Sequence, residues 1–245
     1  MDLNSDLGEA AGSDDEVMPH VTSANIACGA HAGDPATMRR TVELALRHGV
    51  AVGAHPGYRD PGSFGRVALD VAREDLIRDI RAQLEALRDV AQAAGARLAH
   101  VKAHGALYNR GERDDAVATA IAEAVHGFDE GLVLFAPPGS AMERAARTVG
   151  LGVAREGFAD RAYEPDGTLR SRSLPASVHA DPATAAAQAL GIARDRRVRT
   201  SDGGEIALAV DTLCVHGDTP GAPAIVREVR RVLEGAGIAV RAFSV

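Results

Sequence analysis

The chain has 245 residues and a formal net charge of −7, from 34 acidic and 27 basic side chains. This length is enough to bury a sizeable core in one large domain or two small ones, and the acidic excess with mixed charges argues against a nucleic-acid-binding protein, which usually presents a basic face. With two cysteines, no visible signal sequence and no apolar run of membrane-spanning length, the sequence predicts a cytoplasmic protein without a disulfide framework or a membrane partner.

Short β-rich segments alternate with amphipathic helical segments along the whole chain. The expected strands cover residues 1–6, 22–27, 50–55, 98–104, 132–136, 151–154, 206–215 and 238–243. Helices are expected around residues 41–46, 76–91, 114–126, 139–149, 182–195 and 220–234. The first of these helices has clear boundaries, because Asp34 is a good N-cap, Pro35 suits the first turn and Gly49 suits the C-terminal end.

Strands that alternate with helices predict parallel βα units. Seven or eight such units fit a closed (β/α) barrel that forms one domain over residues 1–245. An open doubly wound sheet is the alternative architecture. Residues 155–181 form the least periodic segment, and we expect them to cover one mouth of the barrel.

Four of the nine histidines fall at the ends of four different predicted strands. They are His31, His55, His104 and His216, each close to a glycine. In parallel α/β folds the C-terminal ends of the strands carry the functional groups. Four histidine–glycine pairs that converge at one mouth therefore favour a functional site over four ordinary turns.

Lys102 is the only lysine in a chain that has 26 arginines. It alternates with small apolar residues on its predicted strand, which places it on the inward face together with His100 and His104. The first strand is expected to turn Asn4 and Asp6 inward, so that Lys102 faces Asp6 across the lumen. A purely structural ion pair is one interpretation, but arginine would satisfy a need for charge alone, whereas a compact ammonium suits a small catalytic pocket.

Several familiar catalytic motifs are absent from the sequence. The only lysine precedes Ala103, so no P-loop is present, and the sequence contains neither a Gly-x-Gly-x-x-Gly after the first strand nor a Gly-x-Ser-x-Gly nucleophile elbow. Cys28 is a conceivable nucleophile, although small buried cysteines more often serve packing, and Cys214 in mid-strand is expected to pack in the core.

Several segments, in the same order, resemble the LamB/YcsF family. The resemblance is densest in Asp2–Glu9, Ser23–Pro35, Gly53–Arg66, Val101–Asn109, Glu156–Tyr163 and Val215–Asp218. Two positions depart from the family pattern, since Ser5 stands where the family usually has cysteine and Ala103 where it has proline. The serine excludes a catalytic thiol at position 5, and the loss of the proline removes no chemical group.

The resemblance implies a barrel similar to that of the glycoside hydrolases and deacetylases. It also implies the activity of an ATP-hydrolysing 5-oxoprolinase, of which this chain would be the A component and which opens the lactam of 5-oxoproline to L-glutamate. Two partner subunits, B and C, and ATP used by the complex are implied as well. Because the chain shows no nucleotide-binding motif, we expect phosphorylation to depend largely on the partners.

Such a reaction needs a base for water, donors for developing negative charge and groups that orient the substrate. We expect Asp6 or His104 to act as the base and Lys102 to stabilise negative charge. The candidates for substrate binding are Asn4, Asn25, His31, His55, Tyr108, Asp160, Arg161 and His216.

Two other functions are compatible with these residues. Asp6, His31 and His55 are adequate ligands for a divalent metal ion, as in a metal-dependent deacetylase or amidohydrolase. The third possibility is a non-catalytic regulatory protein that captures a carboxylate ligand. Capture alone, however, requires no buried Asp–Lys pair.

Overall fold

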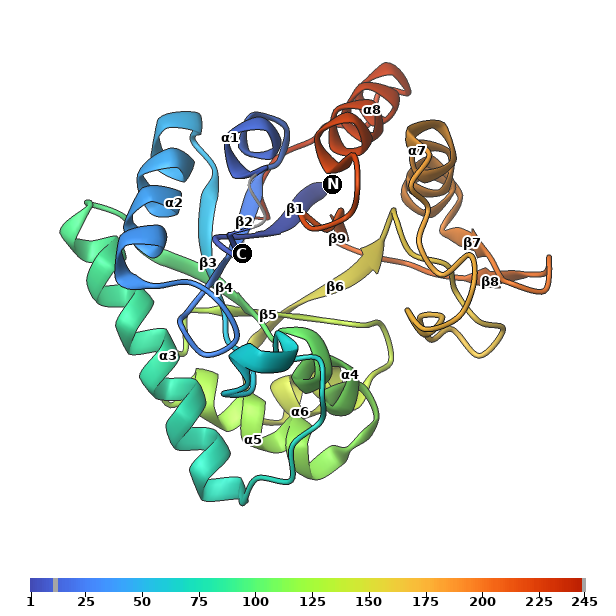
Figure 1. The fold of residues 1–245 in the computed structure, drawn as a ribbon. Helices are drawn as coiled ribbons and strands as arrows, with labels where there is room; N and C mark the ends of the chain where they lie inside the picture. Colours follow the sequence, from blue (N-terminus) through green and yellow to red (C-terminus); the bar gives the residue numbers. More distant parts are fainter. Residues whose placement is uncertain (11–12, 244–245) are drawn as a thin grey trace.

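Seven parallel strands form a closed barrel in the computed structural model, which describes residues 1–10 and 13–243 (Figure 1). The barrel strands are β1 (Asp2–Leu7), β2 (Ser23–Ala27), β3 (Ala51–His55), β4 (Leu98–Lys102), β5 (Val133–Ala136), β6 (Gly152–Phe158) and β9 (Thr212–Cys214). They follow one another around the barrel in this order, and β9 pairs with both β6 and β1 to close it. The predicted (β/α) barrel is thus confirmed, and the closed ring excludes the doubly wound sheet.

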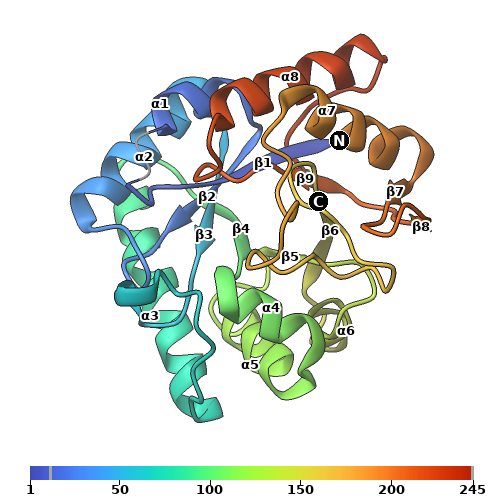
Figure 2. The ribbon, with the colours of Figure 1, turned by 45° about the vertical axis from the view of Figure 1, so that its right-hand side comes forward.

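Helices surround the barrel on its outer side (Figure 2). They are α1 (Asp14–Val17), α2 (Pro35–His48), α3 (Arg73–Ala93), α4 (Gly105–Arg113), α5 (Asp115–His126), α6 (Ala141–Thr148), α7 (Pro182–Leu190) and α8 (Ala222–Gly235). The described residues also form three short helical turns, η1 (Met18–His20), η2 (Pro61–Ser63) and the π-helical η3 (Gly191–Asp195). The sequence did not predict α4, which follows β4 closely and carries Tyr108 at the barrel mouth.

Asp34 and Gly49 cap α2 as the sequence predicts. The side chain of Asp34 accepts a hydrogen bond from the backbone N–H of Thr37 at 2.7 Å, and Gly49 ends α2 in the left-handed region with a φ of +66°. Asp181 accepts in the same way from the backbone N–H of Thr184 at 2.9 Å. These caps satisfy backbone groups that a helix end otherwise leaves unpaired.

Alternate residues of the strands face the helices and the lumen. Leu3 on β1 belongs to the apolar core that the helices cover, whereas Asp6 points into the lumen, where it meets Lys102 from β4. His100 also lies in the lumen, where its ring packs directly against Gly53 of β3 and its Nε2 lies 2.8 Å from Oδ1 of Asn25. A Cβ at Gly53 would lie only 2.0 Å from Nε2 of His100, so a glycine is required there.

The C-terminal segment does not form the expected eighth strand. Residues 238–243 run as an irregular chain beside the N-terminus, where the Met1 amino group donates to the carbonyl of Ala239 at 2.8 Å and the Arg241 N–H donates to the carbonyl of Met1 at 3.0 Å. Phe243 packs against Val133 of the barrel lining. Because a closed barrel has no free strand edge, this segment covers the N-terminal end of the barrel instead.

The expected strand at 206–215 is divided in two. Its first part is β8 (Glu205–Ala207), which forms a hairpin with β7 (Arg197–Arg199) outside the barrel, and its last part is β9. Between β8 and β9 the chain leaves the strand conformation. Just before β9, the carboxylate of Asp211 accepts a hydrogen bond from the backbone N–H of Arg155 at 3.0 Å.

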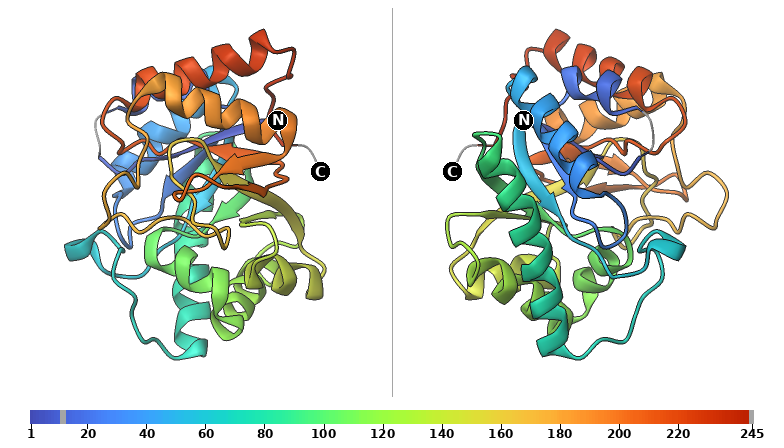
Figure 3. Two further views of the ribbon diagram at one scale, coloured as in Figure 1. Left: turned by 90° about the vertical axis from the view of Figure 1, so that its right-hand side faces the viewer. Right: turned by 60° about the vertical axis from the view of Figure 1, so that its left-hand side comes forward.

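The irregular segment begins later than expected, because β6 continues to Phe158. It then extends over the side of the barrel mouth (Figure 3). Residues 169–173 of this segment line the cavity at that mouth. Within the part of the chain that the structure describes, no helix is long and apolar enough to cross a membrane.

Candidate active site

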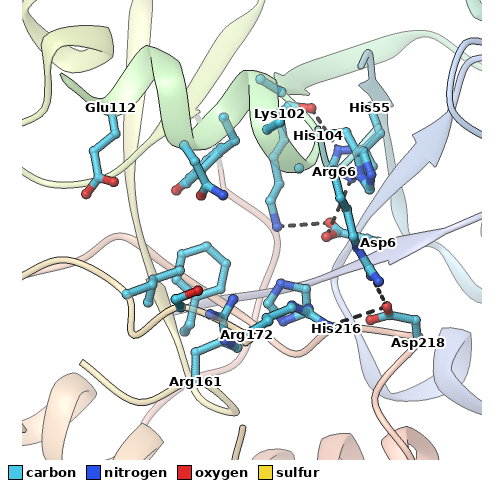
Figure 4. A pocket seen from close by; sticks show the side chains of 18 of the residues that line it. Asp6, His55, Arg66, Lys102, His104, Glu112, Arg161, Arg172, His216 and Asp218 are labelled. Atoms are coloured by element: carbon cyan, nitrogen blue, oxygen red, sulfur yellow. Dashed lines mark hydrogen bonds and ion pairs between the residues drawn. The ribbon is translucent and has the colours of Figure 1, made fainter. Parts of the chain in front are cut away.

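A cavity of about 450 Å³ opens at the C-terminal ends of the barrel strands (Figure 4). The predicted site residues that line it are Asp6, His55, Lys102, His104, Tyr108, Arg161 and His216. The other predicted residues, Asn4, Asn25, His31 and Asp160, are buried behind this lining. The structure therefore brings most of the candidates into one cavity and places the rest in contact with them.

Lys102, the last residue of β4, lies at the centre of the polar network. Its Nζ is 2.9 Å from Oδ1 of Asp6 and 2.9 Å from Oε1 of Glu156, and it donates to Sγ of Cys214 at 3.1 Å. Burial disfavours the ammonium, but the neighbouring Asp6, Cys214 and Glu156 raise the pKa of Lys102 well above its ordinary value. The predicted contact between Lys102 and Asp6 is thus present, and the lysine is held as a cation.

Asp6 has one carboxylate oxygen engaged and one that is less constrained. Oδ1 accepts from Lys102 and from Asn25 Nδ2 at 2.8 Å, whereas Oδ2 accepts no hydrogen bond among the described residues and lies 3.5 Å from Nε2 of His55. Burial disfavours the charged form, but His55 and Lys102 outweigh it and hold the pKa of Asp6 well below its ordinary value. Oδ2 is therefore the oxygen through which Asp6 can act in the cavity.

A layer of amides supports this pair from below. Asn25 Nδ2 donates to Oδ1 of Asn4 at 2.7 Å as well as to Asp6, and Asn25 Oδ1 lies 2.8 Å from Nε2 of His100. Asn4 in turn donates to Oε1 of Glu156 at 3.1 Å. Asn4 and Asn25 are fully buried and orient the charged groups, so they do not meet the cavity as the sequence suggested.

Three histidines and one carboxylate form a cluster at the edge of the cavity, which we call the histidine cluster: Glu9, His31, His55 and His104. Oε1 of Glu9 lies 3.2 Å from Nε2 of His31, 3.2 Å from Nδ1 of His104 and 3.8 Å from Nε2 of His55. Burial lowers the pKa of His55 to about 3. Burial disfavours the charged form of Glu9, but its close contacts with His104 and His31 outweigh burial and lower its pKa.

The opposite side of the cavity carries positive charge. Arg161 is buried, and its guanidinium donates to two backbone carbonyls, those of Ser177 at 3.2 Å and Arg170 at 2.6 Å. Among the residues that the structure describes it forms no ion pair, and burial together with Arg172 lowers its pKa to about 10. Figure 4 shows Arg161 and Arg172 across the cavity from Lys102 and His104. This wall suits an anionic group of a ligand.

Asp160 lies behind the same wall and holds His216. Its carboxylate accepts from the backbone N–H of His216 at 3.1 Å, lies 3.0 Å from Nδ1 of that ring and accepts from Thr219 at 2.9 Å. Burial opposes ionisation, but His216 and Thr219 lower the pKa of Asp160. Asp160 therefore positions His216, whose ring stacks on Phe158 with centroids 5.3 Å apart.

Glu156 reaches Lys102 from the side of a second cavity of about 390 Å³. This cavity and the first share Tyr108 and Phe158 as a partition. Within the described residues, Oε2 of Glu156 and the hydroxyl of Tyr108 are buried without a hydrogen-bond partner. Burial raises the pKa of Glu156 in spite of Lys102.

Cys28 and Ser5 do not take part in the polar network of the cavity, whereas Cys214 does. Cys28 is buried, and burial raises its pKa to about 12, which excludes a thiolate nucleophile at neutral pH. Ser5 faces outward from β1 and donates to the carbonyl of Val215 at 2.6 Å. Cys214 is the exception, because it contacts Lys102 inside the barrel and so does more than fill the core.

The charged residues Glu9, Glu156 and Arg172 were not among the site residues predicted from the sequence. Glu9 follows the first strand and was visible at its end, but nothing in the sequence indicated that it would meet three histidines. Glu156 follows Arg155 on β6, and the strict alternation of an inward Glu156 and Phe158 was the available signal. Arg172 lies in an irregular segment, where no periodicity fixes direction.

Comparisons with known proteins agree over the whole chain. A model of the LamB/YcsF family matches residues 1–245. A protein from Symbiobacterium thermophilum that is named as the A subunit of 5-oxoprolinase is 51% identical over 99% of this chain and 95% of its own length. A protein of the same name from Bordetella pertussis is 51% identical over 99% of this chain and 98% of its own length.

Solved structures give the same result for the fold. The crystal structure of a lactam utilization protein from Thermus thermophilus has a TM-score of 0.93 and 47% identity, with 99% of both chains covered. A family 4 carbohydrate esterase from Streptomyces lividans has a TM-score of 0.50 and 10% identity, over 100% of this chain and 92% of its own. At that identity the likeness concerns the barrel fold alone.

Proposed function

The chain belongs to the LamB/YcsF family, and we propose that it is the A subunit of an ATP-dependent 5-oxoprolinase, which opens the lactam of 5-oxoproline to L-glutamate. The observation that carries the proposal is the buried ion pair of Lys102 and Asp6 at the floor of a cavity whose opposite wall holds Arg161, which has no ion-pair partner among the described residues. A cavity of about 450 Å³ with a few convergent polar groups is within the usual range for small ligands.

The positive wall fits the substrate carboxylate. Arg161 is buried, lines the cavity and carries no carboxylate partner among the described residues. A substrate carboxylate there would supply the missing counter-charge through a charge-assisted pair. Arg172 adds a second positive charge beside Arg161. Its Nη1 also lies 3.5 Å from Oδ2 of Asp218, which pairs with Arg66 as well.

The lactam would then face Lys102 and Asp6. A five-membered lactam is a poor electrophile, and its hydrolysis requires coupling to ATP. Transfer of the terminal phosphate of ATP to the amide oxygen releases ADP and activates the ring carbon, to which water then adds. The C–N bond of this adduct breaks as the ring nitrogen takes up a proton, which opens the ring and leaves an acyl phosphate. A second water hydrolyses the acyl phosphate to the carboxylate of L-glutamate and inorganic phosphate. The Lys102 ammonium is placed to stabilise the negative charge that develops on oxygen.

Of the two expected bases, the geometry favours Asp6. Nε2 of His104 donates to the carbonyl of Phe64 at 2.8 Å, and Nδ1 lies against Nε2 of His55 at 2.9 Å and Oε1 of Glu9 at 3.2 Å, so neither nitrogen is free of a close polar neighbour. Oδ2 of Asp6 has no polar contact shorter than 3.5 Å among the described residues, and Asp6 lines the cavity. A water held by Oδ2 can therefore lose its proton to Asp6 during attack.

ATP and the partners belong to the complex in this proposal. We infer two further subunits, B and C, which supply most of the nucleotide site, because this chain has no P-loop and no other nucleotide motif. An ATP-consuming complex of this kind would work in the cytoplasm, where ATP is available.

The experiment is reconstitution of the chain with candidate B and C subunits. We expect release of glutamate from 5-oxoproline that depends on ATP and on this chain. The Arg161→Gln variant tests whether the positive wall of the cavity binds the substrate carboxylate. Arg147→Ala, which also removes an arginine but from an exposed ion pair with Glu143, is the matched control and should keep its activity. Activity that persists when this chain is omitted would remove it from the reaction.

A second candidate function is metal-dependent hydrolysis of an amide. The observation that favours it is the histidine cluster, whose donor atoms converge beside the cavity. Such an enzyme requires no ATP. Amide hydrolysis by this chain without ATP and without partners would favour it over the ATP-dependent reaction.

A further inference from the structure

The two histidines that face the cavity in the histidine cluster have defined tautomers. Nδ1 of His55 lies 2.8 Å from the carbonyl oxygen of Lys102, and Nε2 of His104 lies 2.8 Å from the carbonyl oxygen of Phe64. A carbonyl oxygen only accepts hydrogen bonds, so each of these nitrogens carries the hydrogen. In the neutral rings, Nε2 of His55 and Nδ1 of His104 are therefore left with bare lone pairs.

These two lone pairs point at each other. Nε2 of His55 and Nδ1 of His104 are 2.9 Å apart, and the ring planes are at 87° to one another. Two acceptors at this distance repel unless a positive species lies between or beside them. Glu9 adds a third acceptor, with Oε1 3.2 Å from the His104 nitrogen and 3.8 Å from the His55 nitrogen.

The separations suit ligands of one metal ion. Two donors that each lie about 2.1 Å from an ion are about 3.0 Å apart at a right angle and about 3.4 Å apart in a tetrahedron. The three donor separations in the cluster, 2.9, 3.2 and 3.8 Å, span these values. The backbone carbonyls that hold the far nitrogens of His55 and His104 are also the usual outer partners of metal-binding histidines.

His31, which the sequence suggested as a ligand, has a different place. Its ring stacks on His104 with centroids 3.6 Å apart and planes within 2° of parallel. A histidine binds a metal ion in the plane of its ring, at about 2.1 Å from the nitrogen. An ion in the plane of the His104 ring would lie well outside the parallel plane of His31, too far from it for a bond of that length. Nε2 of His31 instead contacts Glu9 at 3.2 Å, so His31 positions the Glu9 carboxylate.

We propose that Glu9, His55 and His104 bind one divalent transition-metal ion whose open side faces the 450 Å³ cavity. All three residues line that cavity, whereas His31 does not. Two imidazoles and a carboxylate select zinc, cobalt, manganese or iron over magnesium and calcium, which prefer oxygen ligands alone. When bound, such an ion polarises an oxygen of the substrate or acidifies a water, and Oδ2 of Asp6 remains beside it as a proton acceptor.

Metal binding can be tested without turnover, so its result is independent of the 5-oxoprolinase proposal. The purified full chain is stripped with a chelator, incubated with Co²⁺, and assayed for cobalt content by mass spectrometry and for d–d absorption in the visible range. Zn²⁺ and Mn²⁺ are tested by content, and Mg²⁺ serves as the oxygen-preferring comparison. We expect one ion per chain for the transition metals and none retained for Mg²⁺.

Variants identify the ligands. His55→Gln and His104→Gln are each expected to lose the cobalt spectrum, and circular dichroism confirms that the variants are folded. His31→Gln is expected to reach one ion per chain with the same spectrum, at an affinity about 10- to 100-fold lower because Glu9 is less well oriented. His179→Gln, remote from the cluster and bonded to Gln188 at 3.2 Å, is the matched control and should bind as the wild type does.

Three results would overturn the proposal. The first is a wild-type chain that retains none of the transition metals. In that case a proton, and not a metal ion, would lie between Nε2 of His55 and Nδ1 of His104. The second is unchanged binding in a folded His104→Gln variant. The third is loss of the spectrum in His31→Gln at saturating cobalt, which would assign His31 as a ligand.

Discussion

Lys102→Arg keeps the positive charge of the only lysine but replaces the compact ammonium with a planar guanidinium. Nζ of Lys102 has polar atoms of Asp6, Glu156, Cys214 and Asn4 within 3.5 Å, so a guanidinium cannot take its place without displacing these groups. Overpacking of this kind lowers the free energy of unfolding by about 1–3 kcal/mol, and we expect the variant to fold. Loss of the ammonium's hydrogen bond to developing negative charge removes about 1.5–3 kcal/mol of transition-state stabilisation, or about 10- to 150-fold in kcat.

The assay is ATP-dependent glutamate release by the reconstituted complex, with stability followed by urea unfolding. Lys102→Met separates charge from shape, since it leaves Asp6 and Glu156 without their cation and costs about 3–5 kcal/mol of stability. Arg147→Lys, on an exposed ion pair with Glu143, should change neither quantity. A folded Lys102→Arg protein with wild-type turnover would refute the reasoning and leave the ion pair a structural one.

Four further outcomes are expected. Asp6→Asn should abolish glutamate formation while the complex still co-purifies, and full activity would remove Asp6 from the mechanism. Arg161→Gln should raise the KM for 5-oxoproline about 10-fold or more, with a smaller effect on kcat, because one charge-assisted contact to the substrate is lost; an unchanged KM would contradict the carboxylate site. Ser5→Cys should leave turnover unaltered, because the side chain faces away from the lumen; a large loss of kcat would place position 5 in the site. The lowered pKa of Asp160 means that its ionic contribution to stability is fully present above the ordinary value of 3.8 and is lost as the pH falls through the folded value. The difference in unfolding free energy between wild type and Asp160→Asn should therefore shrink in acid, and a difference that widens there would contradict this sign.

The barrel could be predicted from the sequence because its signals are local. Helix caps such as Asp34 and the apolar stripes of α3 are read within a few residues, and parallel βα units follow from their alternation. The last segment could not be predicted in the same way. Residues 238–243 have strand-like composition, but only the pairing of β9 with β1 shows that no edge is left for them.

The part of the site that lies on the strands could be predicted from their alternating sequence pattern, and the part on the loops could not. Alternation along β1 and β4 is enough to place Asp6 and Lys102 on the same interior side. The partners of the histidines depend on chain segments far apart in sequence, such as Glu9 with His104, which no local period links. Arg172 lies on an irregular segment whose course is set by tertiary contacts, so its place at the cavity required the structure.

The most direct test of the central claim is a single reconstitution. The chain is combined with candidate B and C subunits, 5-oxoproline and ATP, and glutamate and ADP are measured together. We predict that the two products form in step, that both ATP and this chain are required for glutamate, and that Lys102→Arg reduces the rate. Glutamate release that proceeds without this chain, or that is unaffected by Lys102→Arg, would contradict the account.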